Sequence, residues 1–202
     1  GKSASELSRK DEIFTSDSGL ISIAGGKLTG YRKMAERVVN RIAEDFEEFE
    51  GRELKACTTD QIPLNGSDFT KFKQVSKYIA QVQARLEPEG LTAYDAWFLV
   101  TNYGKQTDRI LRIFSDLKDP DPYWRLMKAE LHVSLDHEMI HNPMDFLIRR
   151  TGRLYFDIES IGKYLEKVAE ECALRLNASA GVMSGWVAEM KLQIKQHSSF
   201  EL

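Results

Sequence analysis

The stretch from Gly19 to Asn40 constrains the fold of this chain more than any other. A short apolar run, 20–23, is typical of a strand, and a turn at Gly25 and Gly26 follows it. Beyond the turn, apolar residues recur at the spacing of one helical face. They are Leu28, Tyr31, Met34, Ala35, Val38, Val39, Ile42 and Phe46. The pattern therefore predicts a strand, a glycine turn and a long amphipathic helix.

A strand that passes through glycines into a helix is how open α/β domains form anion sites. The first helical turn has unpaired N–H groups and the positive end of the helix dipole, and glycine lets a ligand approach the backbone. Lys27 adds a positive charge there, and Thr29 offers a hydroxyl as a cap or ligand. The spacing of Gly25, Gly26 and Gly30 matches neither the dinucleotide fingerprint nor a phosphate-binding loop. On spacing alone, an anion site and a plain strand-to-helix turn are equally good interpretations.

Length and composition exclude several classes of protein. With 202 residues, 42% of them hydrophobic, the chain can bury a sizeable core in one or two domains. A net charge of -3 without a long Lys/Arg run argues against nucleic acid as the main partner. Cys57 and Cys172 lie far apart and form no metal or redox pattern, which indicates a reducing, cytoplasmic setting. No apolar run approaches the roughly 18 residues of a membrane span, and no signal peptide is recognised.

The first residues predict a β-hairpin, with strands at 11–14 and 20–24 around a Thr-Ser-Asp-Ser-Gly turn. Two strands alone are marginal in water, and a strand that feeds an anion-binding turn normally belongs to a larger sheet. The sequence begins at Gly1 without Met, and no other convincing strand follows. We therefore expect this segment to be the last piece of an α/β domain whose remainder lies outside the sequence.

The rest of the chain reads as a linker followed by helices. Turn formers, among them Pro63, predict a linker over 52–68. From Phe69 onward the apolar spacing predicts helices at 69–86, 93–103, 106–117, 122–140, 144–151, 158–176 and 180–196. Their expected N-caps are Thr92, Asp121, Asp157 and Ser179. The predicted fold is mainly α: residues 1–51 form the strand-turn-helix segment, 52–68 the linker and 69–202 an all-α bundle of about seven helices.

One motif in the bundle suggests a metal. His137-Glu-Met-Ile-His141 matches the zinc-protease pattern, in which two histidines on one helix face bind zinc. However, Asn142-Pro143 breaks the helix at the second histidine, and His132 is too close on the same helix to complete the site. We therefore predict no metal site, and treat the match as coincidence.

Two further clusters have a functional and a structural interpretation. Arg149, Arg150 and Arg153 stand near Asp145 and Asp157. This charged patch could bind a phosphate or an anionic lipid, but an ion-pair network within the bundle is the better interpretation. The aromatic residues of the bundle are read as core or interface groups rather than a cofactor site. They are Tyr123, Trp124, Tyr155, Phe156 and Trp186.

The amino-acid sequences of two segments resemble those of one family of flavoenzymes. GGKLTGYRKMAE, at 25–36, is similar to the end of the flavin domain in FAD-dependent glycerol-3-phosphate dehydrogenases and glycerophosphate oxidases. DFLIRRT, at 145–151, together with TDQIPL and NYG, resembles the helical C-terminal domain of the same enzymes. The resemblance covers nearly the whole chain. It implies that the strand-turn-helix segment is a remnant of a flavin-binding domain, and that the large N-terminal flavin domain is missing.

The resemblance also implies roles for particular residues. Arg9 and Lys27 occupy positions that approach the phosphorylated substrate, glycerol 3-phosphate. Gly25, Gly26, Lys27, Leu28 and Thr29 occupy positions that lie against the flavin ring of FAD. A phosphate dianion calls for Arg and Lys, and a helix N-terminus stabilises negative charge on the ring. No catalytic residue is expected within this chain.

For the whole protein, the resemblance implies oxidation of glycerol 3-phosphate to dihydroxyacetone phosphate. Dehydrogenases of the family pass the electrons to membrane quinone, and the oxidases pass them to oxygen. We expect a cytoplasmic protein that binds peripherally to the inner face of the membrane. A homodimer is one possible oligomeric state, and nucleic acid is not an expected partner. The chain alone should be inactive. The rival interpretation is a non-catalytic helical interaction module whose first segment pairs with a partner's sheet edge.

Overall fold

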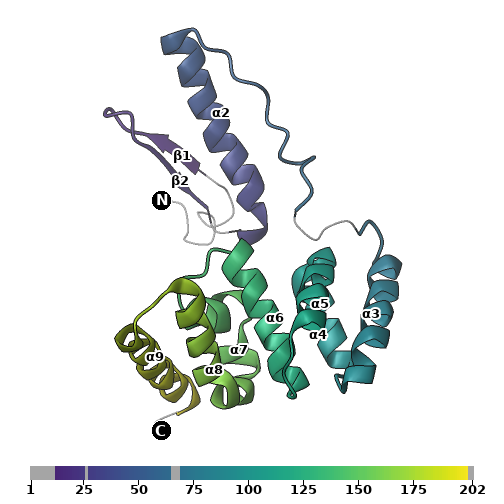
Figure 1. Ribbon diagram of the computed structural model, residues 1–202. Helices are drawn as coiled ribbons and strands as arrows, with labels where there is room; N and C mark the ends of the chain where they lie inside the picture. Colours follow the sequence, from purple (N-terminus) through teal and green to yellow (C-terminus); the bar gives the residue numbers. More distant parts are fainter. Residues whose placement is uncertain (1–11, 26, 65–68, 200–202) are drawn as a thin grey trace. The chain divides into compact units, whose positions relative to one another are not determined.

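The computed structural model describes residues 12–25, 27–64 and 69–199 (Figure 1). The chain divides into two compact units, Gly1–Leu64 and Asn65–Leu202. The division falls inside the segment 52–68, where the sequence predicts a linker.

The first unit is a hairpin followed by one long helix. Strands β1 (Glu12–Thr15) and β2 (Ile21–Ala24) pair antiparallel, with Ile13 opposite Ile23. After β2 come a short 3-10 turn, η1 (Leu28–Gly30), and helix α2 (Tyr31–Glu50). The helix ends where Gly51 adopts the left-handed conformation and donates its N–H to the carbonyl of Glu47. The predicted strand and helix are confirmed, and Gly26 of the predicted turn lies outside the described residues.

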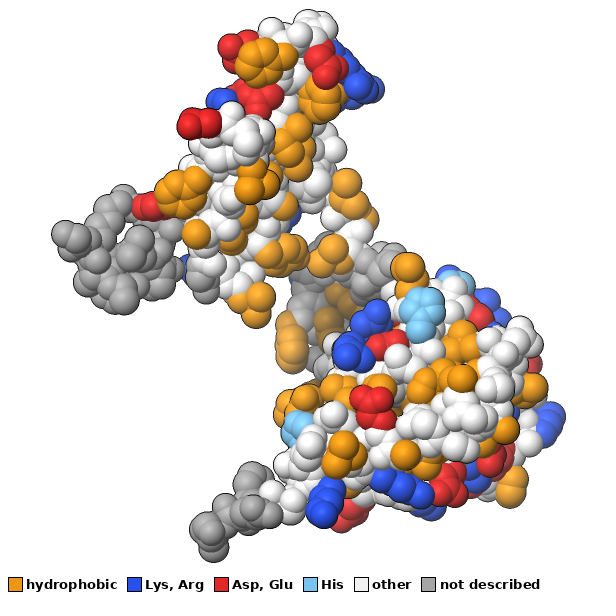
Figure 2. Space-filling view, turned by 90° about the vertical axis from the view of Figure 1, so that its left-hand side faces the viewer, with side chains coloured by type: hydrophobic (Ala, Val, Ile, Leu, Met, Phe, Trp, Pro, Cys, Tyr) orange, Lys and Arg blue, Asp and Glu red, His pale blue; other side chains and the backbone are white. Residues whose placement is uncertain are grey.

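This first unit has no hydrophobic core of its own. None of the residues described in it is buried, although α2 and the hairpin carry many apolar side chains. The large exposed ones are Phe14, Leu20, Ile23, Leu28, Tyr31, Val39, Ile42, Phe49, Leu54, Ile62 and Leu64. Figure 2 shows such side chains spread along the surface of this unit. A shallow apolar groove of about 200 Å³ lies between Ile21 and the end of α2.

The second unit is entirely helical in its described part. Its helices are α3 (Phe72–Leu86), η2 (Glu87–Glu89), α4 (Ala93–Tyr103), η3 (Gly104–Gln106), α5 (Thr107–Asp116), α6 (Pro122–His137), η4 (Asp145–Arg150), α7 (Arg153–Phe156), α8 (Ile158–Leu176) and α9 (Ala180–Ser198). The mainly-α fold with an all-α C-terminal part is therefore confirmed. None of the described helices is long and apolar enough to cross a membrane.

Helix α6 lies at the centre of this second unit (Figure 1). One side of α6 packs into a core made with α3, α4 and α5, through Leu126, Ala129 and Val133. The opposite side packs into a second core made with η4, α7, α8 and α9, through residues such as Met127 and Leu131. A helix that is buried on two opposite sides in this way holds two halves of a bundle together.

The helix boundaries follow the predicted caps with some differences. The Thr92 hydroxyl accepts the N–H of Asp95, and the Asp121 carboxylate accepts the N–H groups of Tyr123 and Trp124. Helix α6 ends at His137 rather than near residue 140, because Met139 takes a left-handed backbone conformation with φ of 55°. Asp157 precedes α8, but its side chain caps no N–H group of that helix.

The segment around DFLIRRT differs most from the prediction. It forms a π-helix, η4, rather than an ordinary short helix. The N–H and the hydroxyl of Thr151 both donate to the carbonyl of Phe146, five residues back, which is the π-helical spacing. The turn then continues into the short helix α7, which the sequence pattern did not predict.

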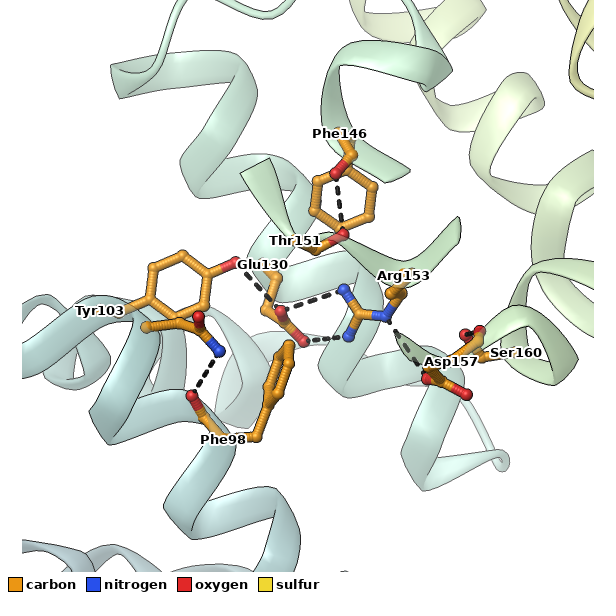
Figure 3. A network of polar contacts seen from close by, with 9 residues as sticks. Phe98, Tyr103, Glu130, Phe146, Thr151, Arg153, Asp157 and Ser160 are labelled. Atoms are coloured by element: carbon orange, nitrogen blue, oxygen red, sulfur yellow. Dashed lines mark hydrogen bonds and ion pairs between the residues drawn. The ribbon is translucent and has the colours of Figure 1, made fainter. Parts of the chain in front are cut away.

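A buried ion pair joins the two halves of the helical unit (Figure 3). Glu130, on α6, is 0% exposed, and its carboxylate accepts two hydrogen bonds from Arg153 of α7, at 2.9 and 3.3 Å. Tyr103, at the end of α4, donates its hydroxyl to the same carboxylate at 3.0 Å. The Arg153 guanidinium also lies over the ring of Phe98, 5.2 Å from its centroid. Burial, and then the Glu130 carboxylate, raise the pKa of Tyr103 well above its ordinary value.

Removing one partner of this pair should destabilise the helical unit strongly. Glu130→Ala leaves the Arg153 charge buried without its partner, which should cost about 3–5 kcal/mol of unfolding free energy. The double variant Glu130→Leu/Arg153→Met removes both charges and should lose less unfolding free energy than Glu130→Ala. All three tryptophans, Trp97, Trp124 and Trp186, lie in this unit. Their fluorescence in urea titrations therefore reports its stability alone.

The exposed pair Glu166–Lys191 provides the control, because Glu166→Ala should cost less than about 1 kcal/mol. Equal losses for Glu130→Ala and Glu166→Ala would contradict the importance of the buried pair.

A second buried carboxylate ties α6 to α8. The Glu171 carboxylate accepts a hydrogen bond from the Lys128 ammonium at 2.7 Å, and it contacts Nε2 of His132 at 2.6 Å. Burial raises the pKa of Glu171, but the hydrogen bonds from Lys128 and His132 outweigh it and hold that pKa below the ordinary 4.5. The ionised form is therefore the one that the fold stabilises.

This arrangement predicts a pH-dependent contribution to stability. A carboxylate with a lowered folded pKa stabilises the fold above its ordinary pKa, and the contribution is lost as pH falls below it. The stability difference between the native chain and Glu171→Gln should thus be largest near pH 7 and shrink below pH 4.5. Urea titrations by tryptophan fluorescence at pH 7, 5.5 and 4 measure it. The control is Glu170→Gln, at the exposed residue next to Glu171, and its stability difference from the native chain should not change with pH. A stability difference for Glu171→Gln that stays constant with pH would contradict the prediction.

Candidate functional site

The predicted site lies where β2 turns into α2. Gly25 follows β2 directly, and Lys27 has an extended backbone with φ of -96° and ψ of 102°. Leu28 and Thr29 then form the first residues of η1, whose Gly30 N–H donates to the carbonyl of Lys27 at 2.8 Å. The hairpin and the helix therefore hold these four residues in one short bend at the N-terminal end of α2.

The polar groups of this bend are not used by the fold that surrounds them. No side chain caps the start of η1 or of α2 in the described part of the chain. The side chain of Lys27 makes no ion pair there, and the Thr29 hydroxyl makes no hydrogen bond there. Leu28 is 87% exposed, and Gly25, Lys27 and Thr29 are exposed as well. The bend thus presents main-chain donors, a hydroxyl and an ammonium group to a ligand or a covering surface.

Two of the predicted site residues, Arg9 and Gly26, lie outside the residues that the structure describes. The described members of the site are Gly25, Lys27, Leu28 and Thr29, which are neighbours in sequence. The predicted contact of Arg9 with the same substrate as Lys27 therefore stays a prediction.

The two histidines of the HExxH match do not lie on one helix face. His137 is the last residue of α6, and His141 lies beyond the left-handed residue Met139, so the two no longer share a helix face. Among the described residues, no group of three or more His, Cys, Asp or Glu side chains could hold a metal ion.

The arginine cluster near η4 is an ion-pair and hydrogen-bond network. Arg149 pairs with Asp145 at 2.6 Å, and Arg150 donates to the main-chain carbonyl of Glu138 at 2.7 Å. Together with the buried partner of Arg153, these contacts support the structural interpretation of the cluster.

The sequence pattern missed a pocket in the helical unit. The pocket has a volume of about 460 Å³ and lies where α4, α6, α7 and the start of α8 meet. Aromatic rings and carboxylates line it, with the Glu130–Arg153 pair in its wall. The signal in the sequence was the aromatic residues Tyr123 and Phe156, which the pattern assigned to a core or an interface but which are exposed. Only Trp124 of that group is fully buried.

Comparison with known proteins identifies the family. The family model of the C-terminal domain of alpha-glycerophosphate oxidase matches residues 57–181, more than half of the chain. The chain belongs to this family. The resemblance stated from GGKLTGYRKMAE and DFLIRRT is thereby confirmed.

Two relatives match a longer part of this chain than the family model does, and the match includes the strand-turn-helix segment. The chain is 40% identical over 173 residues to the aerobic glycerol-3-phosphate dehydrogenase of Bacillus subtilis, covering 84% of this chain and 31% of the relative. It is 36% identical over 197 residues to the enzyme of the same name from Staphylococcus haemolyticus, covering 97% of this chain and 35% of the relative. The chain thus spans about a third of the length of these relatives.

A solved structure shows the same fold. The glycerol-3-phosphate dehydrogenase from Bacillus halodurans, complexed with FAD, superimposes with a TM-score of 0.79 at 31% identity. The match covers 95% of this chain and 38% of that one.

Because the bend contributes little to the fold, its polar residues should be dispensable for stability. Lys27→Ala and Thr29→Ala should each change the stability of α2 by less than about 0.5 kcal/mol. Gly51→Ala should cost about 1–2 kcal/mol, because Gly51 has a φ of 63° and alanine is strained there. Hydrogen exchange of the α2 amides in the full-length protein, where we expect the missing part of the sheet to cover this unit, measures all three. Loss of protection in Lys27→Ala comparable to that in Gly51→Ala would contradict the assignment.

Proposed function

We propose that this chain is the C-terminal part of an FAD-dependent glycerol-3-phosphate dehydrogenase. The whole protein would oxidise glycerol 3-phosphate to dihydroxyacetone phosphate. The observation that carries the proposal is the identity of 36% over 97% of the chain to an aerobic glycerol-3-phosphate dehydrogenase. Residues 1–51 would be the end of the flavin and substrate domain, 52–68 the linker, and 69–202 the helical C-terminal domain.

The missing core of the first unit supports this division. A hairpin and one helix with no buried residue among those described cannot be stable by themselves. Large exposed apolar side chains that gather on one unit normally face another surface. We infer that the hairpin extends a larger sheet, and that the apolar side of α2 packs on the remainder of the flavin domain.

The bend from Gly25 to Thr29 has the groups that FAD requires on one side of its ring. FAD, when bound, supplies the acceptor for the hydride that leaves the substrate. The uncapped main-chain N–H groups of Leu28 and Thr29 and the positive end of the α2 dipole would stabilise negative charge on the ring. The exposed Leu28 side chain would cover part of the ring or of the surrounding domain, and so exclude water.

Lys27 would bind the substrate phosphate, and Arg9 would be its partner. The ammonium of Lys27 has no ion-pair partner in the described residues, so it can neutralise an incoming dianion without breaking an existing contact. The guanidinium of Arg9 would add two parallel hydrogen bonds. Lys27 and Arg9 bind and orient the substrate in this proposal, and neither moves a proton.

The electron acceptor of the whole protein is proposed to be quinone, which places the enzyme at the membrane surface. Oxygen is the alternative, as in the oxidases that give the family model its description. Oxygen consumption with glycerol 3-phosphate, measured without added quinone, separates the two. A cytoplasmic protein attached peripherally to the membrane, and a homodimer, also remain proposals.

Lys27→Ala in the full-length enzyme tests the site. Losing the charge opposite a phosphate dianion should lower kcat/KM for glycerol 3-phosphate by about 10- to 150-fold, since hydrogen bonds to charged groups contribute about 1.5–3 kcal/mol. Lys27→Arg should keep part of the activity. Lys33→Ala is the matched control, because Lys33 is an exposed lysine on α2 that pairs with Glu36.

An unchanged kcat/KM in Lys27→Ala would favour the rival interpretation, a helical module that pairs with a partner through its hairpin. A full-length protein that purifies without bound flavin would refute the enzyme itself. Tight stoichiometric binding of FAD by the isolated 202-residue chain would refute the proposal that the site is incomplete here.

A further inference from the structure

The pocket of the helical unit belongs to no part of the proposed flavin or phosphate site. It is formed within the second unit by α4, α6, α7 and the first turn of α8. Its volume of about 460 Å³ falls within the usual range for ligand sites. The pocket is independent of the proposed dehydrogenase activity.

Exposed aromatic rings surround this pocket. Tyr94 from α4, Tyr123 from α6 and Phe156 from α7 all line it, and Phe156 is 85% exposed. Phe98 also lines the pocket, and its ring centroid lies 6.3 Å from that of Tyr94. Solvent-exposed rings on three helices around one hollow are unusual for a free surface, and aromatic residues are enriched at the centres of protein interfaces.

The charges of the pocket are unbalanced. Its lining carries the carboxylates of Asp95, Glu130, Asp157 and Glu159 and the cations of Arg153 and Lys163. Both cations are already paired, Arg153 with Glu130 and Lys163 with Asp121 at 3.3 Å. Glu159 has no ion pair among the described residues, and Asp157 makes only a 3.9 Å contact with Arg153. The pocket therefore has excess negative charge beside aromatic faces, which favours a cation.

One buried donor in the pocket wall also lacks a partner. The Arg153 side chain is 8% exposed, and its Nε–H has no hydrogen bond in the described structure. Its nearest carboxylate is that of Asp157, at 3.9 Å (Figure 3). The Nε atom itself is buried, so this donor is enclosed by the protein rather than offered to a ligand in the pocket.

We propose that this pocket binds an arginine-containing peptide segment of a separate partner protein. The partner's guanidinium would lie between the aromatic rings and pair with Glu159 and Asp157. The site already stacks one guanidinium, since Arg153 lies 5.2 Å from the centroid of Phe98. Arginine suits the pocket better than lysine because its planar, weakly hydrated group stacks on rings and forms two hydrogen bonds with a carboxylate. An acidic segment would be repelled by the same carboxylates.

The test compares two peptides that differ only in charge. N-acetyl-Gly-Arg-Gly-amide should shift the NMR signals of residues around Tyr94, Tyr123 and Phe156 in the 202-residue chain. The citrulline peptide has nearly the same shape without the charge, and should bind about tenfold or more weakly. Equal binding of the two peptides, or signal shifts centred on other helices, would overturn the proposal.

Variants of exposed residues separate binding from folding. Glu159→Gln and Phe156→Ala should each weaken the arginine peptide about three- to tenfold, without changing the NMR spectrum elsewhere. Glu170→Gln, an exposed acid further along α8, should bind as the native chain does. If Glu170→Gln weakened binding as much as Glu159→Gln, the effect would be one of net charge and the proposed site would be wrong. Loss of peptide binding in the full-length protein would show that its own chain covers the pocket, and would overturn the assignment to a separate partner.

Discussion

The buried pair between Glu130 and Arg153 is the contact on which the helical unit depends. Neither charge can be accommodated alone in an interior position, so the two helices that carry them must stay together. The carboxylate is further fixed by Tyr103, which belongs to a third helix. Because Glu130 lies on α6, between two hydrophobic cores, the pair also determines how those two cores are aligned. The π-helix η4 leads into the short helix that carries Arg153.

The same pair lies in the wall of the pocket. Aromatic rings of α4, α6 and α7 line the pocket as well. The rings of Phe98 and Phe146 face the guanidinium of Arg153, at 5.2 and 5.6 Å, rather than filling the hollow. A contact required for stability thus leaves a polar, ring-lined recess on the surface. The recess becomes a binding site only because two carboxylates beside it, Asp157 and Glu159, have no cation bound closely.

Local patterns predicted the elements better than they predicted their contacts. The strand-turn-helix segment and helix α4 follow from glycine positions, a capping box and apolar spacing, all of which act over a few residues. The ends of α6 and the form of η4 depend on Met139 and Thr151, whose conformations are set by surroundings that a local pattern does not contain. The partner of Arg153 was missed for a related reason: Glu130 is 23 residues away, and nothing local distinguishes it from a surface glutamate. The bend at Lys27 could be predicted because all its described members are neighbours in sequence.

The two units differ in what they need from the rest of a protein. The described residues 69–199 of the helical unit bury two hydrophobic cores and pair the buried charges of Glu130 and Arg153 with each other. The first unit has the opposite character: its helix has a strongly apolar face, yet none of its described residues is buried. Hydrophobic burial is the main source of folding free energy, and a unit that buries so little must obtain it from a surface outside itself. The bend at Gly25–Thr29 stands at the end of that uncovered face. In the proposed function, the surface that covers this face would also form the opposite wall of the bend, so binding at Lys27 and assembly of the first unit would depend on the same contact.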